Sequence, residues 1–91
     1  MISITTYKLK PFLTKDEVRE VMGVFAKEGP GPGTTAHYIT ADGSGGVVIT
    51  DSDDLQAGYR NILNYTRWIE YDMTPVLDVE QAVPHIMDSL S

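Results

Sequence analysis

Alternation of apolar and polar positions predicts four strands along the chain. β-branched residues, which suit the pleated surface of a sheet, are frequent in these segments. Lys10-Pro11 ends the first strand, and Thr74-Pro75 is expected to close the last, since proline donates no hydrogen bond to a neighbouring strand. The sequence Asp42-Gly43-Ser44-Gly45 is typical of a hairpin turn. The predicted strands cover residues 2–9, 35–41, 46–50 and 68–73.

Apolar residues that recur every three to four positions predict a first helix after Thr14. Thr14 and Glu17 have the spacing of a capping box, in which each side chain accepts a hydrogen bond from the other residue's amide. Gly29-Pro30 stops the helix. Residues 29–33 lack the Lys-Ser/Thr pair of a phosphate-binding loop and follow a helix, so they are interpreted as a connector. The apolar stripe of this helix consists of Val18, Val21, Met22 and Phe25.

A second helix is predicted after the acidic segment 51–54. Ser52 or Asp53 can cap it, and acidic residues in a first turn suit the helix dipole. Gly58 lies beside the apolar stripe, where a missing side chain permits a close approach to the sheet. The stripe consists of Leu55, Tyr59, Ile62, Leu63 and Thr66.

The C-terminal tail, residues 77–91, is predicted to contain a broken helix. Asp78 can cap a helical turn over residues 79–83. Pro84 should prevent that turn from continuing, because proline removes a helical hydrogen bond and clashes with the preceding turn. It could instead begin a final turn that runs to Leu90.

The order strand, helix, strand, strand, helix, strand is the split β-α-β-β-α-β pattern of ferredoxin-like folds. It predicts an α+β fold in which a four-stranded antiparallel sheet carries both helices on one face. A solvated second face should be polar, yet both faces of the hairpin and of the last strand carry apolar or aromatic residues. Such a patch marks an interface or a ligand site. We therefore expect a homodimer through the sheet face.

Composition and charge narrow the class of protein. Residues 1–91 are expected to form one domain that includes the helical tail. The net charge is −6, and the 7 basic residues are scattered singly, so no nucleic-acid partner is expected. The absence of cysteine excludes disulfides and thiolate chemistry and fits a reducing, cytoplasmic location. No apolar run approaches the ~20 residues of a membrane span, so no membrane partner is expected.

The ending Trp68-x-x-Tyr71-x-x-x-Pro75-Val76-Leu77-Asp78, together with the Gly43–Gly46 hairpin and the order of elements, resembles the dimeric α+β barrel superfamily. It is most similar to a group of small bacterial proteins of unknown function within that superfamily. The superfamily includes antibiotic-type monooxygenases, haem-degrading enzymes, polyketide cyclases and ligand-sensing domains, so the resemblance does not select a function. Neither His37 nor His85 matches the position of the haem ligand in those enzymes, so no cofactor or metal is expected.

His37 is the main candidate for a general acid or base, because the ordinary pKa of histidine lies near neutrality. The alternative is a strand histidine with only a structural hydrogen bond. Tyr38 and Glu70 are further acid–base candidates. Glu70 and Asp72 alternate with Trp68, and they either enter a partly apolar barrel or remain solvated charges at its rim. The expected ligand-binding or interface residues are Tyr7, His37, Tyr38, Trp68, Glu70, Tyr71 and Asp72.

Two functions remain open from the sequence. The first is a homodimeric ligand-binding or interaction module, whose ligand would be a small apolar or aromatic molecule. The alternative is a cofactor-free enzyme of monooxygenase or cyclase type, acting on a small aromatic or polyketide-like substrate. A cavity of a few hundred Å³ with convergent polar groups would favour the enzyme, and a filled space between the sheets the module. Trp68 is interpreted as a contact with the partner subunit, or else as a residue packed under the second helix of its own subunit.

Overall fold

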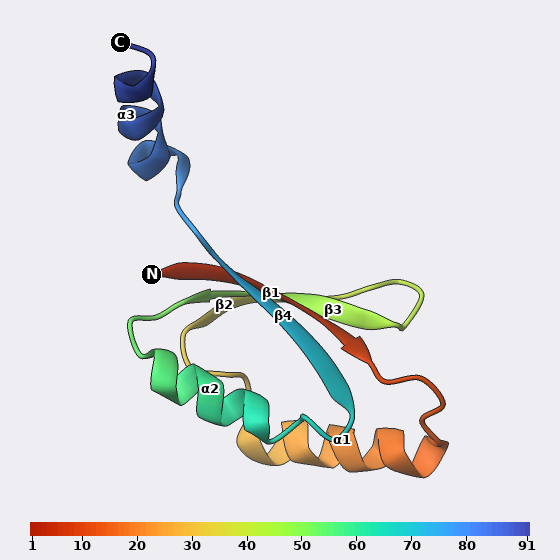
Figure 1. The fold of residues 1–91 in the computed structure, drawn as a ribbon. Coiled ribbons are helices and arrows are strands. Elements are labelled where there is room, and N and C mark those ends of the chain that lie inside the picture. Colours follow the sequence, from red (N-terminus) through yellow and green to blue (C-terminus); the bar gives the residue numbers. More distant parts are fainter.

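Four strands and three helices follow one another along residues 1–91 of the computed structural model. They form one antiparallel sheet in the order β2-β3-β1-β4, so β2 and β4 are its edges. Helices α1 and α2 lie on one side of the sheet, and α3 projects on the other (Figure 1). The predicted α+β fold with one four-stranded antiparallel sheet is confirmed. The elements are β1 (Ile2–Leu9), α1 (Lys15–Glu28), β2 (Thr34–Ile39), β3 (Gly45–Asp51), α2 (Leu55–Leu63), β4 (Ile69–Val76) and α3 (Val79–Ser89).

The predicted start of α1 and the predicted hairpin turn are both confirmed. The Thr14 hydroxyl accepts a hydrogen bond from the Glu17 amide at 3.1 Å, and the Glu17 carboxylate accepts one from the Thr14 amide at 3.3 Å. In the β2–β3 turn, Asp42 accepts hydrogen bonds from the amide and the hydroxyl of Ser44, which lower the pKa of Asp42 to about 2. Gly43 follows with a φ of 76°, a conformation that glycine adopts without strain.

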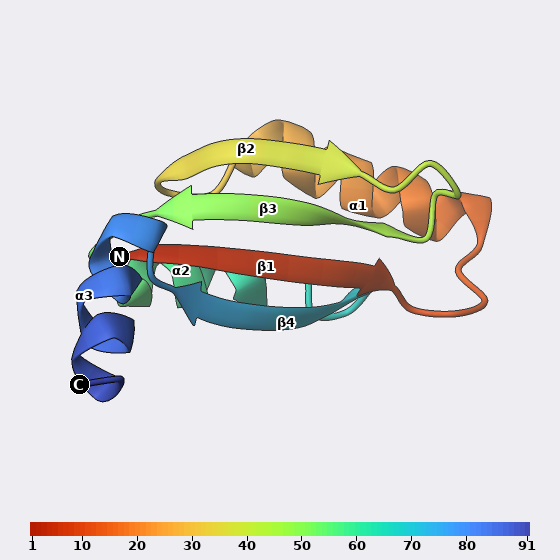
Figure 2. The same cartoon turned by 90° about the horizontal axis from the view of Figure 1, so that it is seen from above.

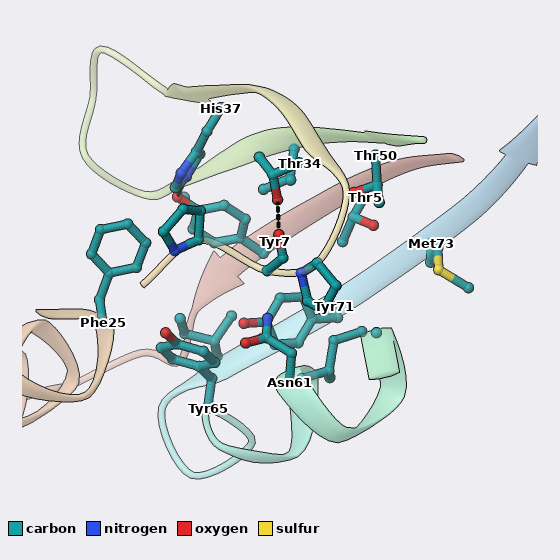
Figure 3. Close-up of a pocket in the computed structure, with 18 of the residues that line it drawn as sticks. Thr5, Tyr7, Phe25, Thr34, His37, Thr50, Asn61, Tyr65, Tyr71 and Met73 are labelled. Atoms are coloured by element: carbon teal, nitrogen blue, oxygen red, sulfur yellow. Dashed lines mark hydrogen bonds between the residues drawn. The ribbon is translucent and has the colours of Figure 1, made fainter. Parts of the chain in front are cut away.

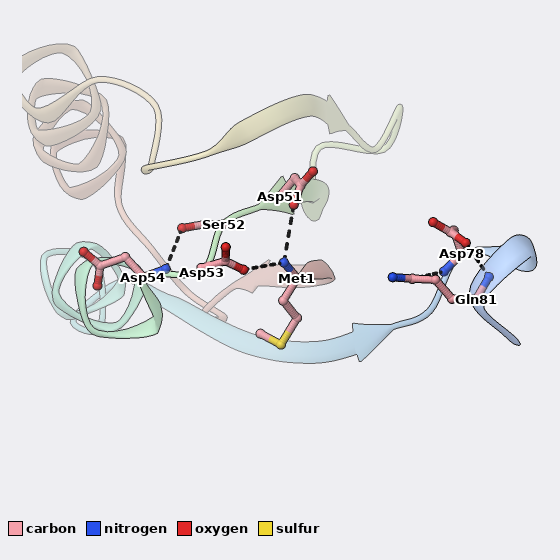
Figure 4. A network of polar contacts seen from close by, with 7 residues as sticks. All are labelled: Met1, Asp51, Ser52, Asp53, Asp54, Asp78 and Gln81. Carbon is pink, nitrogen blue, oxygen red and sulfur yellow. Dashed lines mark hydrogen bonds and ion pairs between the residues drawn. The ribbon is translucent and has the colours of Figure 1, made fainter.

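The predicted cap of α2 was wrong by one or two residues. Asp54 caps the helix by accepting a hydrogen bond from the Ala57 amide at 3.0 Å. Ser52 instead accepts from the Asp54 amide, and Asp53 lies 2.9 Å from the amino group of Met1 (Figure 4). A side chain at Gly58 would meet nothing within 4 Å, so this glycine is not needed for a close approach to the sheet.

Two prolines expected to end elements lie inside them. β4 continues through Pro75 to Val76, because β4 is an edge strand on which a missing amide can face solvent. α3 is one continuous helix that contains Pro84. The helix therefore lacks the hydrogen bond that an amide at position 84 would donate to the Glu80 carbonyl, yet its backbone runs on. Asp78 caps α3, as predicted.

The buried core is small and lies at one end of the layer between helices and sheet. It consists of Val21 of α1, Tyr65 and Trp68 of the turn after α2, and Ile69 of β4. Trp68 is only 7% exposed within the single chain, which leaves it little surface for contact with a partner. Its indole nitrogen has no hydrogen-bond partner.

Cross-strand neighbours assign the side chains of the sheet to two faces. On the helix-facing side, Thr5 lies opposite Val48 of β3 and Met73 of β4. The opposite side, which faces the viewer in Figure 2, is here called the open face. On this side Ile4 lies opposite Ile49. The open face comprises Ile2, Ile4, Thr6, Lys8, Ala36, Tyr38, Val47, Ile49, Asp51, Glu70, Asp72, Thr74 and Val76.

Candidate functional site

A cavity of about 340 Å³ lies between the helix-facing side of the sheet and helices α1 and α2 (Figure 3). Its volume falls within the roughly 300–1,000 Å³ of pockets that hold small molecules. Ser3, Thr5 and Thr50 line its floor, at sheet positions where large aliphatic side chains would fill the layer. Phe25 and Met22 of α1 line it as well, and both remain partly exposed. Small polar residues on the strands therefore leave the space open.

Tyr7 and His37 form a hydrogen-bonded pair in the cavity wall. The Tyr7 hydroxyl lies 2.7 Å from Nε2 of His37, and the tautomer of the ring decides which group donates. The His37 ring also meets Phe25 edge-on, with ring centroids 6.0 Å apart. Three elements, β1, β2 and α1, therefore place one polar pair within an aromatic surround (Figure 3).

Gly46 of β3 makes room for Tyr7. The two residues are opposite each other across the β1–β3 pair. A methyl group on Gly46 would overlap the Tyr7 hydroxyl and the Tyr38 carbonyl. The missing side chain at Gly46 therefore leaves the space in which the Tyr7 hydroxyl contacts His37. In this sense Gly46 is a positioning residue for the Tyr7–His37 pair.

Burial affects the tyrosines that line the cavity. It raises the pKa of Tyr7 and, with a smaller contribution from Glu28, that of Tyr65. It raises the pKa of Tyr71 furthest, and the neighbouring Tyr65 and Tyr7 add to that shift. The rings of Tyr7 and Tyr71 lie 6.1 Å apart. All three phenols are therefore neutral hydrogen-bonding groups near pH 7.

The cavity wall is almost free of formal charge. Asp54 is the only Asp, Glu, Lys or Arg residue that lines it, and its carboxylate accepts the capping hydrogen bond of α2. The other polar groups are hydroxyls, the His37 ring and the amide of Asn61. Such a wall suits a neutral molecule, since an ion entering it would lose hydration without gaining a counter-charge.

The residues proposed from the sequence divide between two faces. Tyr7, His37 and Tyr71 come together in the cavity. Tyr38 is 66% exposed on the open face, and Glu70 and Asp72 are exposed on the same face at the β4 edge. Trp68, the remaining candidate, lies in the core. The structure therefore does not join Tyr38 or Glu70 to His37.

Several cavity residues were not predicted from the sequence, among them Thr5, Thr50 and Asn61. Asn61 follows Gly58 by three residues and precedes Tyr65 by four, the spacing of one helix face, and this signal could have found it. Thr5 and Thr50 could be placed only once the β1–β3 register was known. No group of three or more acidic or histidine side chains gathers to hold a metal ion. None of the three helices has the length and apolar character needed to cross a membrane.

Comparison with known proteins gives a family but no activity. A search of curated proteins finds no match to the chain. A family model described as a domain of unknown function, DUF3303, matches residues 1–90. The match spans all seven elements and every residue of the cavity. The chain therefore belongs to the DUF3303 family.

Proposed function

We propose that this protein is a homodimeric ligand-binding module that holds a small, neutral, mainly apolar molecule in the cavity between its sheet and its helices. The observation that carries the proposal is the cavity itself, about 340 Å³ in volume and lined by apolar side chains with a few polar groups. It lies between the sheet and the helices of one chain and not between two sheets, so the criterion of a filled or an open space between sheets does not apply to it. The Tyr7–His37 pair supplies a fixed point where a hydroxyl or carbonyl group of the ligand can form a hydrogen bond. An aromatic ligand would also pack against Phe25 and Tyr71.

The proposed assembly is a ferredoxin-like unit that pairs through its open face into a dimeric α+β barrel, in the cytoplasm. The strand order β2-β3-β1-β4 and the placement of α1 and α2 on one side support this topology. The open face supports the pairing, because Ile4, Val47 and Ile49 present aliphatic surface that no element of the chain covers. The acidic Glu70 and Asp72 lie at the β4 edge, where a polar rim is expected.

The ligand proposal is tested by titration calorimetry with two probes of similar shape, 1-naphthol and 1-methylnaphthalene. Only the first has a hydroxyl group, and one hydrogen bond is worth about 0.5–1.5 kcal/mol net, so 1-naphthol should bind about 3- to 10-fold more tightly. Tyr7→Phe should abolish this preference. Tyr38→Phe is the matched control, because it removes the same hydroxyl from the open face.

Two results would contradict the ligand proposal. One is the absence of binding by either probe at their solubility limits. The other is binding that persists unchanged in Val48→Trp, a substitution that fills the cavity from its floor. A correctly folded Val48→Trp chain, checked by circular dichroism, is required for that comparison.

The 2.7 Å contact between Tyr7 and His37 favours a second candidate, a cofactor-free enzyme of monooxygenase or cyclase type. A histidine poised by a tyrosine can accept a proton from an activated carbon of an aromatic or polyketide-like substrate. Anthrone is a suitable probe, since anthrone and O₂ give anthraquinone and water without a cofactor. Oxygen consumption that is accelerated by the protein and lost in His37→Phe would support the enzyme. If the protein does not accelerate oxygen consumption above the uncatalysed rate, the enzyme is excluded and only the binding module remains as a candidate.

A further inference from the structure

Helix α3 is amphipathic, yet none of its side chains is buried against another element of the chain. All hydrogen bonds of residues 78–91 are local, within the helix and its caps. One face of α3 is polar and carries Gln81, His85 and Asp88. The opposite stripe is aliphatic, and its members are 42–75% exposed. This stripe, the arm stripe, consists of Val79, Val83, Ile86 and Leu90.

An isolated helix of this kind would not persist in water. α3 has 11 residues, fewer than the roughly 12–15 at which isolated helices become even marginally stable. Pro84 weakens it further by removing one backbone hydrogen bond. The capping box of Asp78 and Gln81 supports only its first turn. The helical state of α3 therefore requires a surface against which the arm stripe packs.

The direction of α3 decides which surface is within reach. Only Leu77 and Asp78 separate the end of β4 from the start of α3. α3 stands on the side of the sheet to which the open face points, whereas α1 and α2 lie on the other side (Figures 1 and 2). A molecule that covers the open face would therefore lie next to α3.

We infer that α3 is an arm that packs the arm stripe against a second copy of this chain. The inference rests on the proposed dimer and explains how that dimer gains enough contact. The open face is four strands wide and up to eight residues long, roughly 500 Å² in flat projection, and the accessible area of its side chains is somewhat larger. A stable interface takes roughly 800 Å² of accessible surface from each partner, so this face alone is near the lower limit, and two exchanged arms add apolar area to it.

A lipid surface is the other occupant that an amphipathic helix can have. Helices that lie on membranes carry Lys and Arg on the polar face. Residues 77–91 contain Asp78, Glu80 and Asp88 and no Lys or Arg. The charge of the arm therefore favours a protein partner over an anionic membrane.

The experiment compares four full-length chains by sedimentation equilibrium: wild type, Ile86→Glu, His85→Glu and Ile49→Glu. Ile86 and His85 are adjacent, and both changes introduce an acidic side chain, but only Ile86 lies on the arm stripe. Wild type should sediment as a dimer of 10.1 kDa chains. Ile86→Glu should raise the dimer dissociation constant at least roughly 30-fold, and His85→Glu should leave it within about twofold. Hydrogen exchange of the α3 amides should be slow in the dimer and at least roughly 10-fold faster in Ile86→Glu.

The remaining outcomes distinguish a failure of the arm inference from a failure of the proposed dimer. If Ile49→Glu gives monomers while Ile86→Glu behaves as His85→Glu, the dimer through the open face stands and the arm inference is overturned. If wild type is a monomer at micromolar concentration, both the dimer and the arm are overturned. If the α3 amides become protected only after vesicles of phosphatidylcholine and phosphatidylglycerol are added, the arm binds lipid and the inference is wrong.

Discussion

The two faces of the sheet have opposite characters, and the difference is unusual for a sheet covered by helices on one side. On β1, the helix-facing side carries Ser3, Thr5 and Tyr7, whereas the open face carries Ile2 and Ile4. A sheet normally places its aliphatic residues under the helices and its polar residues toward solvent. At these positions of β1 the usual placement is reversed: small polar residues form the floor of the cavity on the covered side, and isoleucines lie on the uncovered side. This difference is the basis of our two proposals, that the helix-facing side admits a small molecule and that a second copy of the chain covers the open face.

The largest expected effect is on stability, and it distinguishes the buried core on the helix-facing side from the cavity on the same side. Trp68→Ala should lower the free energy of unfolding by about 3–5 kcal/mol, because it empties the small core. Met73→Ala, in the cavity wall, should cost less than about 1.5 kcal/mol, because Met73 is 46% exposed. Urea titration of both variants measures the two losses. Equal losses would show that the cavity is packed in solution.

The second prediction concerns the open face. Ile4→Asp should weaken dimerisation by about 2 kcal/mol or more, since it places a charge at the centre of the proposed contact. Ile39→Asp is the matched control, because Ile39 is 72% exposed and belongs to the helix-facing side. Size-exclusion chromatography over a dilution series distinguishes the two. Equal dissociation constants for both variants would mean that the open face is not the contact.

A third comparison uses two glycines, one with no space for a side chain and one with open space around it. Gly46→Ala should destabilise the fold by about 1–3 kcal/mol and reduce the preference for 1-naphthol, because the added methyl group displaces the Tyr7 hydroxyl. Gly58→Ala should stabilise it by about 0.5–1 kcal/mol, because α2 has open space at that position. Thermal unfolding of the two variants gives the signs. A neutral Gly46→Ala would show that Tyr7 can leave its place without cost.

The smallest effect is the dependence of stability on pH. In the folded chain, burial raises the pKa of Tyr7, Tyr65 and Tyr71 above the value of about 10 that tyrosine has when unfolded. The stability held by the neutral phenols is therefore complete below about pH 10 and falls as the pH rises through the folded-state pKa values. The urea midpoint should drop in that range, together with a delayed rise of tyrosinate absorbance. Ionisation of all five tyrosines near pH 10 with no loss of stability would contradict this.

The sequence was sufficient for the elements that depend on local signals. The capping box of Thr14 and Glu17, the Asp42–Ser44 turn and the alternation of β1 are each contained in a few consecutive residues. The error at Pro75 has a tertiary cause. Pro75 is tolerated because β4 is an edge strand, and the edge position is a property of the whole sheet.

The site was only partly predictable for a similar reason. Tyr7 and His37 were both named as candidates, but their contact joins residues 30 positions apart and depends on the pairing of β1, β3 and β2. A slip of one residue would turn either side chain to the open face. The sequence alone therefore groups His37 with Tyr38 and Glu70 as acid–base candidates, and the structure places Tyr38 and Glu70 on the opposite face.

The most direct test of the account is to locate a bound probe on one face of the sheet. We propose methyl-resolved NMR of the wild-type protein titrated with 1-naphthol. The methyl signals of Thr5, Val48 and Met73, on the helix-facing side, should shift with saturation, and those of Ile4 and Ile49, on the open face, should stay within error. Shifts confined to Ile4 and Ile49 would contradict the account, because they would place the ligand on the surface that we assign to the dimer.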